Sequence, residues 1–155
     1  MKAAALVALL KASNLKVATA ESCTGGLVAA ALTDIAGSSE IFDRGFVTYS
    51  NNAKSEMLGV PAAVIAKHGA VSAEVARAMA EGALAHSEAD IAIAITGIAG
   101  PSGGTKEKPV GLVHFACARR GSVLRHLEKH YGDIGRDNVR TASVATALEL
   151  LAGAI

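Results

Sequence analysis

The run from Ile91 to Ile95, which reads Ile-Ala-Ile-Ala-Ile, constrains the fold more than any other part of the sequence. In a β-strand successive side chains point to opposite faces, so the isoleucines share one face and the alanines the other. Both faces are then apolar, which is typical of a strand in the middle of a sheet that helices cover on both sides. The run therefore predicts an α/β fold with a buried central sheet.

Helical and extended patterns alternate on either side of this run, and no repeat or linker separates them. Ser72 is the expected N-cap of one helix, and Ser50 or Asn51 that of another. The chain has 155 residues, which is enough for one domain with its own core, and we expect residues 1–155 to form it. In chain order, the expected elements are helix 3–12, strand 15–19, helix 26–35, strand 42–49, helix 51–58, helix 72–86, strand 90–96, a hairpin of strands 110–118 and 122–131, and helix 138–151.

Composition and charge exclude several classes of protein. The net charge is +1 and no basic stripe with interleaved aromatic side chains occurs, so we expect no nucleic-acid polymer as a partner. Cys23 and Cys117 lack the spacing of a disulfide framework or a zinc site, and the histidines lack that of any metal site. We therefore expect neither a metal nor another cofactor.

The N-terminal apolar run superficially imitates a signal peptide. Lys11 interrupts it, and its leucines recur at the three- and four-residue spacing of an amphipathic surface helix. No stretch reaches the roughly 20 apolar residues that a membrane-spanning helix needs. We expect a soluble, cytoplasmic protein with no membrane partner.

The chain around the predicted strand 42–49 contains the groups that a serine nucleophile with a lysine base requires. Ser39 precedes the strand, Tyr49 ends it and Lys54 lies in the helix that follows. For the three to meet, the chain before the strand must fold back over its far end. Lysine accepts the serine proton only as a neutral amine, which requires burial or a nearby positive charge such as that of Arg44. From the residues alone, a polar turn serine and a solvated lysine are the alternative.

A second candidate site follows the predicted strand 15–19. Glycines permit close approach of the backbone and hydroxyls donate hydrogen bonds, so this turn could seat an anion at a helix N-terminus, although an ordinary capped turn explains it equally well. The turn consists of Ser22, Cys23, Thr24, Gly25 and Gly26. Cys23 is also a rival nucleophile, with Glu21 and Lys54 completing an amidase set, and a small buried side chain is the alternative for it.

A third candidate is the long loop 97–109, which holds four glycines and two prolines. A loop of this length in a compact domain is typical of a lid or binding loop. Thr96, Thr105 and the loop backbone, including Gly97 and Gly100, could close over a ligand. Arg136 and Arg140 could clamp a phosphate through paired N–H donors, or they could be ordinary exposed charges.

Several long motifs in order along the chain are similar to those of one family, the CinA C-terminal domain family of nicotinamide-nucleotide amidohydrolases. The motifs are Ala20-Glu-Ser-Cys-Thr-Gly-Gly26, Asp34-Ile-Ala-Gly-Ser-Ser39, Arg44-Gly-Phe-Val-Thr-Tyr-Ser-Asn51 with Lys54, His68-Gly-Ala-Val-Ser72, and Thr96-Gly-Ile-Ala-Gly-Pro101 through Lys108-Pro-Val-Gly111.

The resemblance implies hydrolysis of the carboxamide of nicotinamide mononucleotide to nicotinate mononucleotide and ammonia, in pyridine-nucleotide salvage and without a metal. It implies Ser39 as the nucleophile, with Tyr49 and Lys54 as its catalytic partners. It also implies a three-layer α/β/α sandwich with a mixed central sheet, and a homodimer. A non-catalytic nucleotide-binding module is the alternative, but binding alone requires none of these three residues.

Overall fold

The computed structural model describes residues 1–155 and has a five-stranded mixed sheet at its centre. The strand order is β2-β1-β3-β4-β5, with β1 parallel to both of its neighbours and β4 and β5 antiparallel. The predicted α/β fold with a mixed sheet is therefore confirmed. The strands are β1 (Val17–Glu21), β2 (Phe42–Val47), β3 (Ile91–Gly97), β4 (Leu112–Arg119) and β5 (Arg125–His130).

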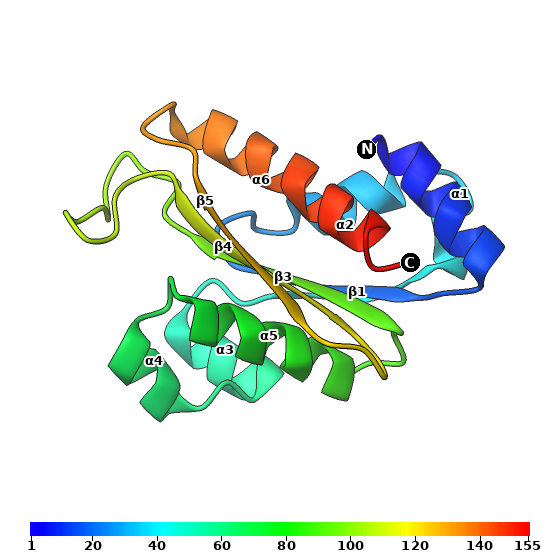
Figure 1. The fold of residues 1–155 in the computed structure, drawn as a ribbon, viewed down its shortest axis with the longest axis horizontal. Helices are drawn as coiled ribbons and strands as arrows, with labels where there is room; N and C mark the ends of the chain where they lie inside the picture. The colour runs from blue at the N-terminus through cyan, green and yellow to red at the C-terminus, as the bar shows by residue number, and fades with distance from the viewer.

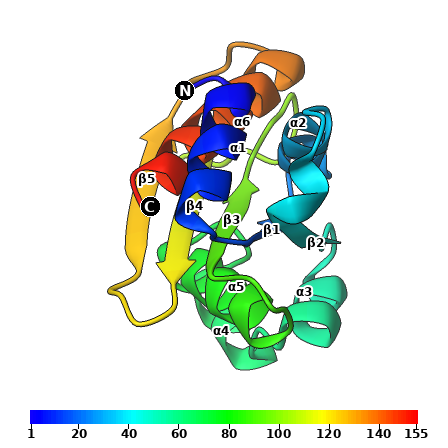
Figure 2. The same cartoon turned by 90° about the vertical axis from the view of Figure 1, so that its right-hand side faces the viewer.

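Helices cover both faces of the sheet and make three layers (Figure 1). Helices α1, α2 and α6 lie on one face and α3, α4 and α5 on the other, and the second view shows the same division (Figure 2). A short 3-10 turn, Ser38–Glu40, precedes β2. The helices are α1 (Ala3–Ser13), α2 (Leu27–Thr33), α3 (Asn51–Leu58), α4 (Ala62–His68), α5 (Ala73–Ala85) and α6 (Arg136–Ala152).

The alternation in β3 divides the hydrophobic core into two clusters. Its isoleucines pack with α1, α2 and α6, whereas its alanines pack with α5, and all five side chains are fully buried. Small residues let the helices of the alanine side approach closely, and a side chain at Gly82 of α5 would collide with the backbone of Leu58 in α3. The predicted burial of this strand on both faces is confirmed.

Local capping agrees with the sequence at two helices. Ser50 accepts a hydrogen bond from the N–H of Ala53 at 3.0 Å, and Ser72 accepts one from the N–H of Val75 at 3.2 Å. The first strand begins at Val17 and ends at Glu21, so both of its ends lie two residues later than predicted. None of the helices is long and apolar enough to cross a lipid bilayer.

The order of the strands creates a switch point beside β1. The chain leaves β1 to form β2 on one side and later returns to form β3 on the other. Because these three strands are parallel, the loops that follow them meet at one edge of the sheet, where open α/β folds bind their ligands. We call this the carboxyl edge, and the opposite one the amino edge.

Candidate active site

A cavity of about 260 Å³ opens at the carboxyl edge, and all three loops line it. Ser22 and Cys23 come from the loop after β1, Tyr49 and Lys54 from the segment after β2, and residues 96–103 from the end of β3 and its loop. Arg136, the first residue of α6, completes the wall. Ala70 and Val71, between α4 and α5, also line it, so the cavity collects residues from five segments that are distant in sequence.

Ser22 and Lys54 form a buried pair in this cavity. The Lys54 amine nitrogen Nζ lies 3.0 Å from Ser22 Oγ and 2.9 Å from the carbonyl oxygen of Thr48. Only 1% of the Lys54 surface is exposed, and its amine forms no ion pair with a carboxylate. The Ser22 N–H donates to Ile95 O at 2.9 Å and extends the pairing of β1 with β3 by one residue, which fixes the serine backbone.

Burial lowers the pKa of Lys54 from its ordinary value of 10.5, because an ammonium without a counter-ion is poorly solvated there. The nearby Cys23 acts weakly in the opposite direction. The lowered pKa increases the neutral fraction of the amine, and a neutral amine 3.0 Å from a hydroxyl can accept its proton. The pair has the geometry and the electrostatics of a nucleophile with its base.

Ser39 does not join this cavity, and the predicted pairing of Ser39 with Lys54 is wrong. Ser39 lies in the 3-10 turn before β2, at the amino edge, whereas Lys54 follows β2 at the carboxyl edge. A six-residue strand of about 20 Å separates the two edges, and the chain before β2 does not fold back along it. Ser39 is exposed, and the neighbouring Glu40 binds Lys11 at 3.0 Å.

Cys23 lines the cavity but lacks the environment of a nucleophile. Burial raises the pKa of its thiol to about 11, so the thiol keeps its proton near neutral pH. Glu21 does not assist it, because its two carboxylate oxygens accept the N–H groups of Val28 and Ala29 at 2.9 and 3.0 Å. Glu21 thereby occupies the N-terminus of α2, where the sequence suggested an anion seat.

Tyr49 and Arg136 close the outer side of the cavity. Arg136 donates one N–H to the Tyr49 hydroxyl at 2.8 Å and another to Gly100 O at 2.9 Å, so it joins the loops after β2 and β3. Tyr49 is 62% exposed and forms no hydrogen bond with Ser22 or Lys54. In this arrangement it is a wall of the cavity and not a proton relay.

Arg140 lies one helical turn after Arg136 but contacts the loop after β1. Its Nε donates to Cys23 O at 3.1 Å and its Nη2 to Thr24 O at 3.3 Å. The backbone N–H groups of Cys23 and Thr24 donate to no backbone carbonyl. Gly25 and Gly26 form the rest of this turn with positive φ angles of 59° and 105° and lie outside the cavity wall, as do Thr24 and Arg140.

The two threonines predicted as ligand contacts form hydrogen bonds to the backbone of loops around the cavity. Thr96 lines the wall, and its hydroxyl donates to Ala70 O at 2.8 Å, which holds another wall residue in place. Thr105 lies outside the wall, and its hydroxyl accepts the N–H of Lys108 at 3.0 Å within the long loop. Gly97 and Gly100 both line the cavity.

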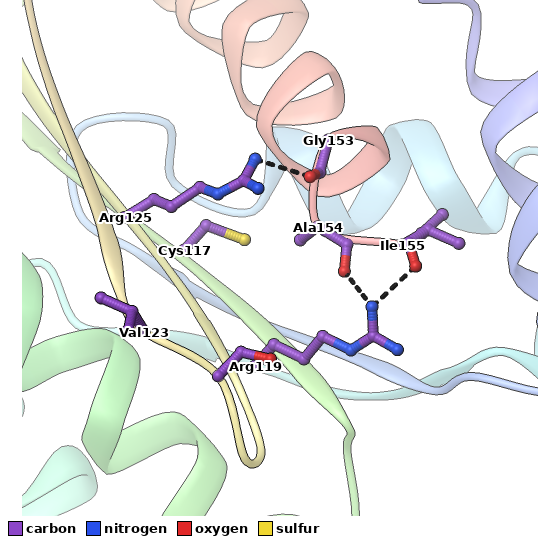
Figure 3. A pocket seen from close by; sticks show the side chains of 8 residues that line it. Cys117, Arg119, Val123, Arg125, Gly153, Ala154 and Ile155 are labelled. Atoms are coloured by element: carbon purple, nitrogen blue, oxygen red, sulfur yellow. Dashed lines mark hydrogen bonds between the residues drawn. The ribbon is translucent and has the colours of Figure 1, made fainter.

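A second cavity, of about 460 Å³, lies at the amino edge (Figure 3). Arg119 and Arg125 point into it and donate to carbonyl oxygens of residues 153–155, which follow α6. Burial raises the pKa of the Cys117 thiol between them to about 12, so it remains protonated. These arginines satisfy the end of a helix, and no activated nucleophile faces them. Nowhere in the chain do three potential metal-ligating side chains come together.

Sequence reasoning assigned Ser22 to anion binding and missed its contact with Lys54. The two residues are 32 positions apart and belong to no common motif spacing. One signal was available: each follows a predicted strand that leads into a helix, and in α/β folds such strands are commonly parallel, with their carboxyl ends at one edge of the sheet. The neighbour relation of β1 and β2, however, is a property of the fold.

The chain is similar to known proteins in sequence and in structure. A family model described as the CinA C-terminal domain matches residues 1–155. The chain is 56% identical over 143 residues to the protein named nicotinamide-nucleotide amidohydrolase PncC of Escherichia coli (strain K12), covering 92% of this chain and 86% of that relative. It is also 56% identical over 146 residues to a CinA-like protein of Citrifermentans bemidjiense, covering 94% of this chain and 35% of that relative.

The chain thus spans about a third of the length of such longer relatives. Among solved structures, the competence/damage inducible protein CihA from Agrobacterium tumefaciens is similar, with a TM-score of 0.96 at 55% identity, covering 97% of this chain and 92% of that one. A CinA superfamily protein from Escherichia coli has a TM-score of 0.93 at 37% identity, covering 99% and 88%.

Proposed function

The chain belongs to the CinA C-terminal domain family, and from that premise we propose that it hydrolyses the carboxamide of nicotinamide mononucleotide to nicotinate mononucleotide and ammonia. In this proposal residues 1–155 act as one amidohydrolase domain in pyridine-nucleotide salvage. Ser22 replaces Ser39 as the nucleophile, and Lys54 is its base. The printed name of the Escherichia coli relative supports the substrate, and this chain covers most of that relative.

The observation that carries the proposal is the buried contact of 3.0 Å between Ser22 Oγ and Lys54 Nζ at the wall of a cavity. A lysine without a carboxylate partner is costly to bury. A nucleotide-binding module gains nothing from such a residue, whereas a serine nucleophile requires a base of lowered pKa beside it.

In the first half-reaction, the neutral Lys54 amine takes the hydroxyl proton of Ser22, and Oγ attacks the carboxamide carbon. The carbonyl oxygen becomes an oxyanion. The N–H groups of Cys23 and Thr24 are the candidate donors for it, because they directly follow the nucleophile and donate to no backbone carbonyl. Lys54, now an ammonium, gives the proton to the leaving nitrogen, and ammonia departs.

In the second half-reaction, water attacks the ester that joins Ser22 to the nicotinate nucleotide. Lys54 takes a proton from the water and returns it to Ser22 Oγ as the ester bond breaks. The products are the free carboxylic acid and the original enzyme. One lysine thus acts as base and acid in both halves, as microscopic reversibility requires for a shared proton carrier.

Arg136 is the proposed phosphate ligand. It is the one arginine of the cavity wall, and its guanidinium can present two parallel N–H donors to phosphate oxygens. Those donors now contact Tyr49 and Gly100, so a bound phosphate would replace two neutral acceptors with a charged one. The glycine backbone of residues 97–103 would lie along the rest of the nucleotide.

The test is ammonia release by the purified protein from nicotinamide mononucleotide, with nicotinamide riboside and free nicotinamide as comparisons. We expect release from the mononucleotide at the highest kcat/KM. Acid quenching during turnover followed by peptide mass analysis should place the nucleotide ester on the peptide that contains Ser22. An ester on another peptide contradicts the nucleophile, and binding of the mononucleotide without any ammonia release favours the non-catalytic module.

A further inference from the structure

Thr24 is fully buried two residues after the proposed nucleophile, and two of its hydrogen-bonding groups have no partner. Its backbone N–H has no acceptor, and its hydroxyl has no partner either. Buried polar groups in proteins are nearly always paired, so an unpaired donor next to a reacting serine indicates a place for a ligand atom. The Cys23 N–H likewise donates to no backbone carbonyl.

The direction of the Thr24 N–H is set from the opposite side of its peptide group. The Cys23 carbonyl and the Thr24 N–H belong to one planar trans peptide unit, in which they point in opposite directions. Arg140 Nε donates to that carbonyl at 3.1 Å, and its Nη2 donates to the next carbonyl, of Thr24, at 3.3 Å. The Arg140 guanidinium therefore holds the carbonyls of Cys23 and Thr24 on one side of the chain. This fixes the Thr24 N–H so that it points to the opposite side.

The positive charge of Arg140 also strengthens the Thr24 N–H as a donor, through the hydrogen bond to the Cys23 carbonyl. A guanidinium stays protonated at all working pH values, and a hydrogen bond from a cation to a carbonyl polarises the peptide, which makes its N–H a stronger donor. Arg140 is half-buried and does not line the cavity, in contrast to Arg136. Its donors face the Ser22 loop, so it is poorly placed to receive a phosphate.

We propose that Arg140 is a positioning residue that aims and polarises the Thr24 N–H as an oxyanion donor, and that it does not bind the phosphate. This inference rests on the proposed amide hydrolysis and replaces the sequence-based assignment of Arg140 to the phosphate. The neighbouring Gly25 is consistent with it, because a side chain there would lie 3.4 Å from Arg140 Nη2 at a φ of 59° that disfavours other residues.

The first experiment compares Arg140→Gln and Arg140→Lys with the wild type on nicotinamide mononucleotide and on its nucleoside, which lacks the phosphate. We expect Arg140→Gln to lower kcat by about 30-fold on both substrates with KM within about threefold, because complete removal of one oxyanion donor costs about 10²- to 10³-fold and this variant only weakens the donor. Arg140→Lys keeps the charge but not the fork and should recover part of the loss. A loss confined to the phosphorylated substrate identifies Arg140 as a phosphate ligand and overturns the inference.

The matched control is Arg125→Gln, which also removes an arginine that donates to a backbone carbonyl, that of Gly153, but at the amino edge. It should leave both kinetic constants near those of the wild type. If Arg125→Gln lowers kcat as much as Arg140→Gln does, the effect is a general loss of structure and the inference fails.

A second readout separates positioning from simple destabilisation. An aldehyde analogue of the mononucleotide can form a tetrahedral adduct with Ser22, whereas the acid product cannot. Arg140→Gln should weaken the aldehyde by the same factor as it lowers kcat/KM and leave the product Kd unchanged. Equal weakening of both ligands overturns the inference. A wild type that releases no ammonia overturns the proposed function instead, whereas an active wild type with an equally active Arg140→Gln variant overturns this inference alone.

Discussion

Each edge of the sheet has a serine and a lysine on neighbouring segments. The two lysines differ in how deeply they are buried and in whether a carboxylate binds the amine. At the carboxyl edge Lys54 is 1% exposed and contacts only the Ser22 hydroxyl and a carbonyl. At the amino edge the Lys11 side chain is 32% exposed and forms an ion pair with Glu40, next to an exposed Ser39. Residue type is the same at both edges, but only one environment favours a neutral amine.

The arginines at the two edges also differ in what they contact. At the amino edge Arg119 and Arg125 satisfy the carbonyls after the last turn of α6, as cations commonly do at a helix C-terminus. At the carboxyl edge Arg136 and Arg140 emerge from the first turns of the same helix and reach across to loops. A helix end whose carbonyls are satisfied is structural, whereas side chains that connect several loops around a cavity belong to a site.

The serine pair gives the largest expected effect. Ser22→Ala should lower kcat for ammonia release by about 10⁴-fold or more, as loss of a nucleophile does in serine hydrolases. Ser39→Ala changes the same residue type at the amino edge and should stay within about twofold of the wild type. The reverse result would return the nucleophile to Ser39 and remove the distinction between the edges.

The lysine pair comes next. Lys54→Met should lower kcat by about 10²- to 10⁴-fold, because it removes the general base. It should also raise the melting temperature at pH 7, because an apolar chain of similar length replaces an amine that is costly to bury. Lys11→Met should change neither by much. Steady-state kinetics and thermal melts of both variants decide between these outcomes.

The pH dependence provides a check on the Lys54 assignment. The rate should rise with pH through the lowered pKa of Lys54, since only the neutral amine is a base. Between that pKa and the ordinary value of 10.5, the unfolded chain holds a proton that the folded chain has released, so wild-type stability rises with pH. The stability advantage of Lys54→Met should therefore shrink as the pH rises in this window; an advantage that grows would mean that Lys54 is charged in the fold.

The arginine pair should separate binding from stability. Arg136→Ala should raise KM for the mononucleotide by about tenfold or more with little change in kcat, because a charge-assisted contact to phosphate contributes about 1.5–3 kcal/mol. Arg125→Ala should leave KM unchanged and lower the free energy of unfolding by about 1 kcal/mol. A KM effect of Arg136→Ala that persists on the nucleoside would argue against phosphate binding.

The cysteines should give the smallest effect. Cys23→Ala should retain kcat within about threefold, because the protonated thiol takes no part in the proposed chemistry. Thiol alkylation of Cys23 and Cys117 at pH 8 should be slow in the folded protein, since burial raises the pKa of the two groups to about 11 and about 12. An inactive Cys23→Ala variant with native stability would make Cys23 the nucleophile after all.

Local sequence patterns predicted much of the fold and little of the site. The alternation from Ile91 to Ile95 located the central strand, and Ser50 and Ser72 located two helix starts, because each pattern acts over a few residues. The site depends on which strands are neighbours. Ser39 and Lys54 are closer in sequence than Ser22 and Lys54, yet β2 holds the first pair apart and the pairing of β1 with β2 brings the second pair together.

The hydrogen bond from the Ser22 N–H to Ile95 O also has a consequence for amide hydrogen exchange. Central strands that are buried on both faces usually exchange only when the whole protein unfolds, whereas short surface helices open locally. The Ser22 amide should therefore exchange with the slowest amides of β1 and β3. Helix α3, which carries Lys54, packs mainly against β2, α4 and α5. Its amides should exchange earlier, so that local opening of α3 moves Lys54 away from a serine whose backbone stays in place.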